Sequence, residues 1–509
     1  MNKKVAGLLL GLCGCCLSAC SQDFQVVSNH AHVSLLPTRT ANAPTFHIDR
    51  AHVPAMYREL MAINLAAVVK VAQANNLDIK IARQQVKESH GRLASSVGAA
   101  FPVLAPTAIF NYSNGVARST AGNIVTADFS SLSPAAAIQW VVNPGQVIYN
   151  IVAAKKRLNA ARAQQAVETQ QTIENGAIEY YQLVQAQADV VAARDAEADA
   201  EELLRFAKLR LKAGTAIPAD VASAEAEVAS RRQGVLLALN RFYHYSTDLA
   251  LTLNLDPTVT LVPSVQSLKA NRLVRTSISI GDLLKLAVKY RPDLQRVREL
   301  VRAAQAEGGA VAWGDLGPTL TTGYTVGDIG GRYYNVPAKG APVSVNYGMH
   351  GYQNLQARGG WQLGLSTFGD IQAAKARERI AEIRADKQLS LVEATVVKAL
   401  QDSRTNAELI PIASDQVRSA QYALNIIKVN YRAGTVTSLE VLVAESQLAQ
   451  AQRDYAAAIA HFNQSQIAIV GAVGLVSDKS ILGSAGLPVM KRSPAAVPSA
   501  PALPGHRAF

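Results

Sequence analysis

The chain has 509 residues and a formal net charge of +12, and 49% of its residues are hydrophobic although only 6% are aromatic. A basic chain raises nucleic acid as a partner, but the Lys and Arg residues are scattered beside Asp and Glu, and no basic run is interleaved with aromatic residues. We therefore predict no nucleic-acid partner and favour long, closely packed helices rich in small residues. No arrangement typical of a catalytic triad or a metal site stands out, so we expect no enzyme, no metal and no cofactor.

The first twenty residues predict a secretory signal with a lipid attachment site. Two lysines precede an apolar run, 5–17, that is too short to persist as a membrane-spanning helix. The run ends in Leu-Ser-Ala-Cys, which resembles the bacterial lipoprotein processing box, so we expect 1–19 to be a signal peptide and Cys20 to carry a covalent lipid. In lipoproteins an Asp directly after the lipidated cysteine signals retention at the inner membrane. Ser21 occupies that position here, which implies transfer of the protein to the outer membrane. The alternative is that Cys20 is one more residue of a Cys-rich signal.

The rest of the chain is a duplication. The sequence Leu-Lys-Ala-Gly-Thr around Gly214 recurs as Tyr-Arg-Ala-Gly-Thr around Gly434, at an offset of 434 − 214 = 220 positions. Matching residues continue on both sides of this turn, and the elements follow the same order in both halves, which indicates a whole-domain duplication. The predicted segments are a signal peptide 1–19, a lipid-anchored extended leader 20–58, a first repeat 59–255, a linker in an equatorial region 256–279, a second repeat 280–476 and a partly disordered tail 477–509.

Each repeat begins with a predicted helix, at 60–97 and at 280–313, that is followed by stretches with a period of two. One apolar face and one small or polar face is typical of a strand between two different environments. The stretches that show this alternation lie at 138–142, 319–326, 343–350 and 361–366. Gly327–Gly330 lacks the context of a phosphate-binding loop, and we interpret it as an outward-facing loop between strands.

A very long helix comes next in each repeat, at 148–212 and at 371–432. About sixty residues at about 1.5 Å each predict a helix of about 90 Å, far longer than a globular domain is wide. Pro411 is expected to kink or split the second copy. A sharp turn at a glycine follows in each copy, and return helices then run to about Leu253 and Val470.

Each repeat thus supplies two long strands, and one chain supplies four. A membrane barrel has no open edges and needs at least about eight strands, so four strands from one chain cannot close. Three chains would supply a barrel of twelve strands. The same stoichiometry would turn the helical hairpins into a closed tube with approximate sixfold symmetry.

The order of elements, the duplication and the repeated Ala-Gly-Thr turn resemble the TolC-like outer-membrane efflux proteins, from about Leu60 to Val476, and the lipobox resembles that of their lipoprotein branch. The resemblance implies a mainly α chain with a membrane β-barrel: a homotrimer with a 12-stranded β-barrel in the outer membrane and a 12-helix α-barrel in the periplasm. It also implies a periplasmic adaptor (membrane fusion protein) and an inner-membrane pump as partners, and no catalytic site in the channel.

In this family the turns after the long helices form the periplasmic tips and lie beside a constriction. The residues that the resemblance assigns to the tip and gate here are Gly214, Thr215, Asp220, Tyr431, Gly434, Thr435 and Glu440. Glu440 stands where an Asp is common, and the basic partner that some members carry just after the glycine is replaced by Val436. Helix capping explains Asp220 and Glu440 equally well, and both roles can hold together.

Trp140 and Trp361 occupy corresponding positions and are expected to anchor the membrane interface, with burial in the equatorial belt as the alternative. The favoured function is a passive duct in the cell outer membrane that exports small molecules, either drugs or metabolites. A duct for type I protein secretion and a lipid-anchored periplasmic helical scaffold are the alternatives.

Overall fold

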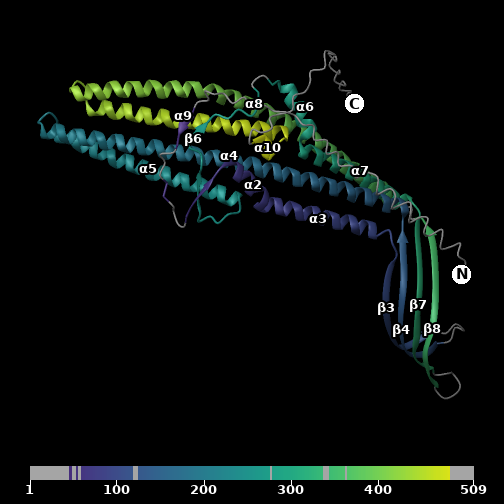
Figure 1. Ribbon diagram of the computed structural model, residues 1–509. Helices are drawn as coiled ribbons and strands as arrows, with labels where there is room; N and C mark the ends of the chain where they lie inside the picture. Colours follow the sequence, from purple (N-terminus) through teal and green to yellow (C-terminus); the bar gives the residue numbers. More distant parts are fainter. Residues whose placement is uncertain are drawn as a thin grey trace, which may run out of the picture.

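The computed structural model of the protein describes residues 45–48, 53–54, 59–118, 124–275, 278–335, 343–361 and 364–481. The signal peptide, the lipid attachment at Cys20 and most of the leader and tail lie outside the described residues. Within them the molecule is elongated, with long helices at one end and a sheet of long strands at the other (Figure 1).

The two repeats contain the same succession of elements. The first comprises β2 (Leu60–Ile63), α2 (Leu65–Asn75), α3 (Leu77–Gly98), β3 (Val103–Arg118), β4 (Ile124–Val142), α4 (Pro144–Lys212) and α5 (Pro218–Thr252). The second comprises α6 (Ile280–Tyr290), α7 (Pro292–Leu316), β7 (Thr319–Asn335), β8 (Val343–Gly360), α8 (Ser366–Ala433) and α9 (Ser438–Val473). The short elements β1 (Thr45–His47), β5 (Thr260–Pro263), β6 (Ser267–Lys269) and α10 (Asp478–Ile481) complete the described chain.

The first predicted helix of each repeat is divided in two, which the periodicity did not reveal. Asn76 ends α2, and its side-chain oxygen then accepts hydrogen bonds from the backbone N–H groups of Asp78 and Ile79, so it caps α3. In the second repeat Pro292 takes the first position of α7, where its missing N–H is not needed. The predicted start at residue 60 was also wrong, because Leu60–Ile63 forms β2 and pairs in parallel with β5.

Of the two effects predicted for Pro411, a kink or a split of the last long helix, the split is wrong, because α8 runs through Pro411 without a break. A proline inside a helix leaves the carbonyl of the preceding turn without its N–H partner. Pro411 is exposed, so water can satisfy that carbonyl. The missing hydrogen bond therefore lies on the solvent-exposed side of the helix.

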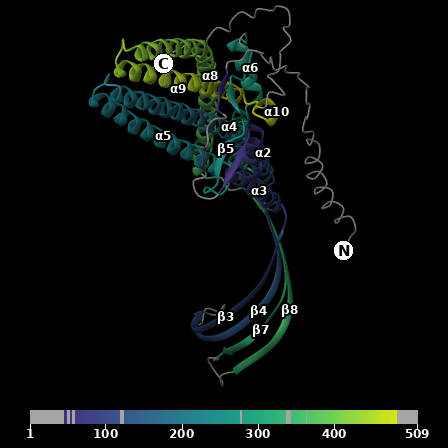
Figure 2. The same ribbon diagram turned by 60° about the vertical axis from the view of Figure 1, so that its left-hand side comes forward.

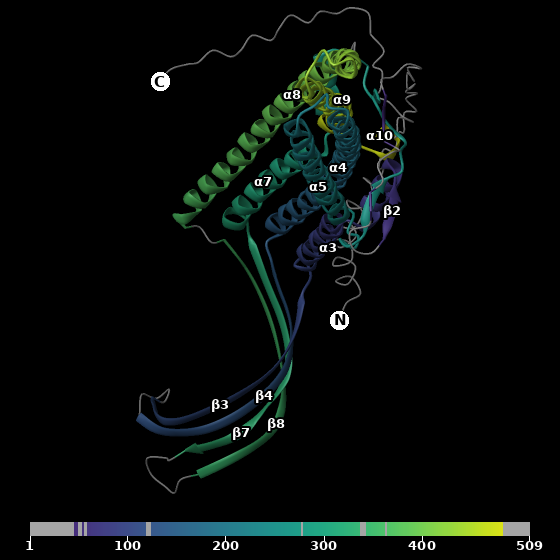
Figure 3. The ribbon, with the colours of Figure 1, turned by 90° about the vertical axis from the view of Figure 1, so that its left-hand side faces the viewer.

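The four long strands form one antiparallel sheet in the order β3-β4-β7-β8. Figures 2 and 3 show this sheet sweeping away from the helices and curving strongly. The neighbouring helices contact one another in the matching order α3-α4-α7-α8, so each strand continues into the helix at the same place in the row. The sheet and the upper helices are thus one continuous wall.

Two strand predictions need correction. The segment Gly327–Gly330 lies inside β7 and is not a loop between strands. Glycine is required there because a Cβ on Gly327 would lie 2.5 Å from the Pro134 carbonyl oxygen of β4. The alternation at 361–366 is not a strand in the described part of the chain, since β8 ends at Gly360 and α8 begins at Ser366.

The main core lies where the middle of α4 meets α5, α9 and the short strands. Fully buried side chains such as Phe242, Leu249 and Ile459 fill it. The linker between the repeats contributes β5 and β6, which pair with β2 and β1 respectively and cover this core. The short strands β1 and β2 before the first repeat's helices and β5 and β6 of the linker therefore lie together over this core.

Candidate functional site

The two hairpin turns, α4–α5 and α8–α9, lie at the end of the molecule opposite the sheet (Figure 1). Gly214 and Gly434 have φ values of +72° and +79°, a left-handed conformation that glycine adopts without steric cost. In each turn the following threonine closes the helix, because its N–H and hydroxyl both donate to a carbonyl five residues earlier. Thr215 bonds Arg210 and Thr435 bonds Asn430 in this way.

Asp220 and Glu440 both lie in the first turn of a return helix and both bond the backbone. The Asp220 carboxylate accepts from the N–H of Ile217 at 3.2 Å. The Glu440 carboxylate accepts from the N–H and from the hydroxyl of Thr437, at 3.2 and 3.1 Å. These contacts give both acids a capping role, since an anion in the first turn also offsets the helix dipole.

Tyr431, a predicted gate residue, is buried inside the chain. Its exposed fraction is 5%, and its ring packs in a small apolar cluster with Leu203 of α4 and Val441 of α9. The guanidinium of Arg210 lies 5.0 Å from the centre of the Tyr431 ring. The tyrosine therefore joins the two hairpins of one chain through both apolar and cation–π contacts.

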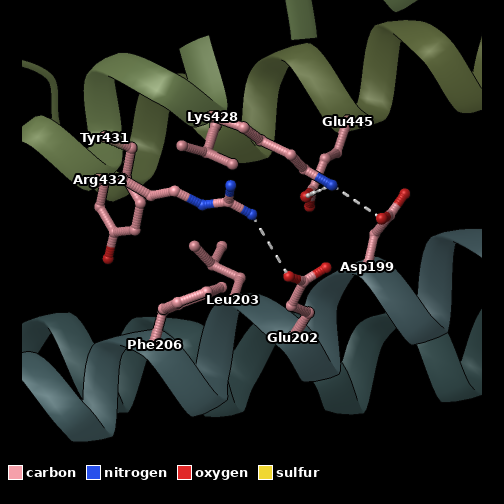
Figure 4. Close-up of a pocket in the computed structure, with 9 residues that line it drawn as sticks. Asp199, Glu202, Leu203, Phe206, Lys428, Tyr431, Arg432 and Glu445 are labelled. Carbon is pink, nitrogen blue, oxygen red and sulfur yellow. Dashed lines mark hydrogen bonds and ion pairs between the residues drawn. The ribbon is translucent and has the colours of Figure 1, made fainter. Parts of the chain in front are cut away.

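Beside this cluster lies an ion network that the sequence reasoning missed. Lys428 of α8 is 2.8 Å from Asp199 of α4 and 3.2 Å from Glu445 of α9, so one ammonium group joins three helices (Figure 4). A second, longer pair joins Arg432 to Glu202 at 3.7 Å. These residues enclose a small space between the hairpins.

Burial and the neighbouring charges together set the pKa values of this network. Burial raises the pKa of Glu445, and the neighbouring Lys428 only partly offsets the effect. Burial alone would lower the pKa of Lys428, but the hydrogen bond from its ammonium group to Asp199 and the charges of both carboxylates hold that pKa above its usual value. Lys428 is therefore a fixed cation between two acids.

A pair at the corresponding positions of the first hairpin could have revealed this network from the sequence. Lys208 and Glu225 lie 220 residues before Lys428 and Glu445, and they form an ion pair of 2.9 Å across their own hairpin. Their side chains are 51% and 53% exposed, whereas those of Lys428 and Glu445 are 25% and 5% exposed. The same pair is thus open in one repeat and covered in the other.

The two predicted interface tryptophans lie at the junction between sheet and helices. Trp140 is near the end of β4, and its indole N–H donates to the Ala100 carbonyl at 3.0 Å. Trp361 directly follows β8 and is 65% exposed. Both therefore lie at the same level of the molecule, where the wall changes from strands to helices.

Among the described residues, no group of His, Cys, Asp and Glu side chains is arranged to hold a metal ion. In the same part of the chain, none of the helices has the length and apolar character to cross a membrane.

Comparison with known proteins identifies the architecture. The family model described as "Outer membrane efflux protein" matches residues 283–475, which is most of the second repeat. Searching curated protein sequences gives no match.

Several solved channels share the fold. The structure of CusC has a TM-score of 0.68 and 16% identity, over 85% of this chain and 99% of that one. The CmeC outer-membrane channel of Campylobacter jejuni has a TM-score of 0.68 and 18% identity, over 87% and 94%. The VceC outer-membrane protein of Vibrio cholerae has a TM-score of 0.65 and 19% identity, over 81% and 96%. The match to this family model thus covers the second repeat, and the likeness to these channels shows a shared fold over most of the chain.

Proposed function

We propose that the protein is the outer-membrane channel subunit of a tripartite efflux system and that three copies form a passive duct for small molecules. A periplasmic adaptor and an inner-membrane pump would supply the coupling and the energy. The observation that carries this proposal is the four-stranded sheet, whose register places a row of large apolar side chains on one face beside a row of small or polar ones on the other, and whose strands continue into long helices.

The register sorts the side chains of the sheet row by row. Residues directly opposite one another in an antiparallel pair share a face. One such row contains only large apolar or aromatic side chains, Leu104, Ile138, Tyr324 and Leu355. A neighbouring row on the other face contains only small or polar ones, Ala105, Ala137, Thr325 and Asn354. This supports an apolar face toward lipid and a polar face toward a water-filled lumen.

The edges of the sheet support assembly from several copies. β3 and β8 are the outer strands of the sheet, and each is long enough to pair with a strand of another chain. Three copies would join β8 of one chain to β3 of the next and close twelve strands. Trp140 and Trp361 would then form a ring of aromatic side chains near the periplasmic edge of the membrane.

The hairpin tips are the proposed gate. Asp220 and Glu440 cap their helices, and in a ring of three chains they would also line the narrow end of the duct with carboxylates. Lys428, between Asp199 and Glu445, takes the place of the missing basic residue at Val436 as a link between the hairpins. We expect Asp220→Ala combined with Glu440→Ala to weaken cation preference, and unchanged ion selectivity would remove both acids from the pore.

We also propose that a lipid on Cys20 anchors the protein at the outer membrane, as the Leu-Ser-Ala-Cys motif supports. Cells grown with radioactive palmitate should label the wild-type protein but not the Cys20→Ala variant. Labelling that persists in Cys20→Ala would refute this attachment site.

Single-channel conductance in planar bilayers tests the channel itself. Purified protein in mild detergent should have the mass of a trimer and should form pores of uniform conductance. A protein that stays monomeric and forms no pore would overturn the proposed function and would favour a lipid-anchored scaffold.

A further inference from the structure

A cleft with a volume of about 480 Å3 lies where the start of α2, the middle of α4 and the strand β6 of the linker meet. In this region α2 packs on α4, and β5 lies against the same helix (Figure 2). The described residues that line the cleft are 64–66, Tyr180, Tyr181, Val184, 265–269 and Asn271. Sites for small molecules commonly have volumes of about 300–1,000 Å3, so the cleft is large enough to hold one.

The cleft favours negative charge. Lys269 is the one charged residue among its described lining residues, which include no Asp and no Glu. The first residues of α2 also line it, and the first N–H groups of a helix have no partner in the helix and carry the positive end of its dipole. The Asn64 side chain accepts from the N–H of Ala67 at 2.8 Å, which leaves the N–H groups of Leu65 and Ala66 for an anion.

The corresponding helix of the second repeat supplies its own anion. Asp282 occupies the third position of α6, where its carboxylate accepts from the hydroxyl of Ser279 at 2.8 Å. The first turn of α2 contains no acid. At the offset of 220 the two tyrosines of the cleft are replaced by Leu400 and Gln401. The features that favour an anion are therefore specific to the first repeat.

Tyr180 gives an independent sign of a ligand. It is 2% exposed and lines the cleft, and its hydroxyl has no hydrogen-bond partner within the described chain. A buried hydroxyl is costly to leave unpaired, so a partner from outside the chain would stabilise it. Beside it, the Tyr181 hydroxyl accepts from the side-chain amide of Asn271 at 3.3 Å, which leaves its own proton to donate. Burial raises the pKa of both phenols, so both stay neutral donors.

The polar side of the cleft is held in place from below. Asn463 of α9 is 1% exposed, donates to the Lys269 carbonyl at 2.8 Å and accepts from the N–H of Asn271 at 2.7 Å. Val184 and Leu268, both buried, add an apolar wall. The cleft thus combines fixed donors and one cation with a surface for an apolar group.

We propose that this cleft binds a small organic acid, whose carboxylate is held by the N-terminus of α2, Lys269 and the Tyr180 hydroxyl, and whose apolar body lies against Val184 and Leu268. One lysine and one helix terminus match a single negative charge better than the higher charge of a phosphate. The site is built from one chain, so it does not depend on the proposed channel.

Two probes of the same shape test the charge: 3-phenylpropionate and its uncharged amide, 3-phenylpropanamide. In full-length protein purified in a neutral detergent, calorimetry should show one molecule of the acid bound per chain. The acid should also raise the unfolding temperature by a few degrees at saturation, whereas the amide and inorganic phosphate should raise it much less. Equal effects of the acid and the amide would overturn the proposed site.

Two substitutions test the named groups. Tyr180→Phe removes the unpaired hydroxyl, so it should weaken binding of 3-phenylpropionate about tenfold without destabilising the ligand-free protein. Ala67→Asp places an acid at the third position of α2, as Asp282 is placed in α6, and should weaken binding at least as much while it caps the helix. Tyr245→Phe in α5, outside the cleft, is the matched control and should bind as the wild type does.

Unchanged affinity in both Tyr180→Phe and Ala67→Asp would overturn the assignment. Protein that forms pores but does not bind the acid would contradict this inference alone. Protein that binds the acid but forms no pore would contradict only the proposed function.

Discussion

The two hairpins of this protein have nearly the same turn and the same cross-hairpin ion pair, but they differ in what lies against them. Lys428 and Glu445 are enclosed by α4, whereas Lys208 and Glu225 face an open groove. A duplicated sequence therefore repeats the contacts within each hairpin. It does not repeat the burial of those contacts, because burial depends on which helix packs against the hairpin. Paired substitutions at corresponding positions can therefore measure what the neighbour contributes.

The largest expected difference is between Lys428→Met and Lys208→Met. Loss of Lys428 leaves Asp199 and Glu445 facing each other with their cation removed, which should cost about 3 kcal/mol. Loss of the exposed Lys208 should change stability by less than about 1 kcal/mol in dissociated protomers. Thermal unfolding followed by circular dichroism measures both, and equal effects would show that burial does not distinguish the two hairpins.

The next difference concerns the first turns of the two long helices. A Cβ on Gly145 of α4 would overlap the Trp313 ring, so Gly145→Ala should destabilise the protein by about 1–3 kcal/mol through overpacking. Gly369 of α8 has open space around it, and Gly369→Ala should stabilise the helix by up to about 1 kcal/mol. The two unfolding temperatures should therefore shift in opposite directions, and shifts of the same sign would contradict this packing.

A third difference depends on pH. Burial raises the pKa of Glu174 in α4 to about 7, with Arg291 opposing the shift, while α8 has Ala394 at the corresponding position. The Glu174 carboxylate lies directly against Gly471, and Asp293 lines the same space. Because the pKa of Glu174 is higher in the folded state, its protonation contributes to the free energy of unfolding. This contribution is fully present below the unfolded pKa of about 4.5 and is lost as the pH rises through about 7.

Glu174→Gln should therefore remove this loss and make the protein more stable than wild type at pH 8 but not at pH 4. Unfolding temperatures measured across this range provide the check. If the unfolding temperatures of the wild-type protein and of Glu174→Gln changed in parallel with pH, the titrating group would be a residue other than Glu174.

The smallest difference is expected at the capping acids. Glu440→Ala removes two hydrogen bonds to Thr437, whereas Asp220→Ala removes one to Ile217. Each change should cost about 1 kcal/mol, with the Glu440 variant the less stable of the two. Hydrogen exchange of the first turns of α5 and α9 would detect this, and a larger effect at Asp220 would reverse the ranking.

Much of the fold could be predicted from the sequence because periodicity and duplication are local signals. The long helices, the glycine turns and the alternation in β7 and β8 can all be read from residue order. The continuation of β7 past Val326 could not, because Gly327, Gly330 and Gly331 hide the alternation where the strand packs against β4. The continuity of α8 through Pro411 could not be predicted either, because the exposure of Pro411 to solvent cannot be read from the order of residues.

The candidate site was harder to predict than the fold. Asp220 and Glu440 were found because capping depends on residues three positions apart. The roles of Asp199 and Lys428 depend on two hairpins that meet across 229 residues of chain, and a single helix pattern carries no such information. Comparison of the two repeats would have marked Lys428 and Glu445, since Lys208 and Glu225 recur at the same spacing.

The two outer strands of the sheet, β3 and β8, also bear on how the protein is made. A newly made chain presents these hydrogen-bonding edges until another strand pairs with them, and such edges readily template aggregation. The level at which the chain is synthesised should therefore decide how much of it aggregates, because a chain that meets no partner keeps both edges open.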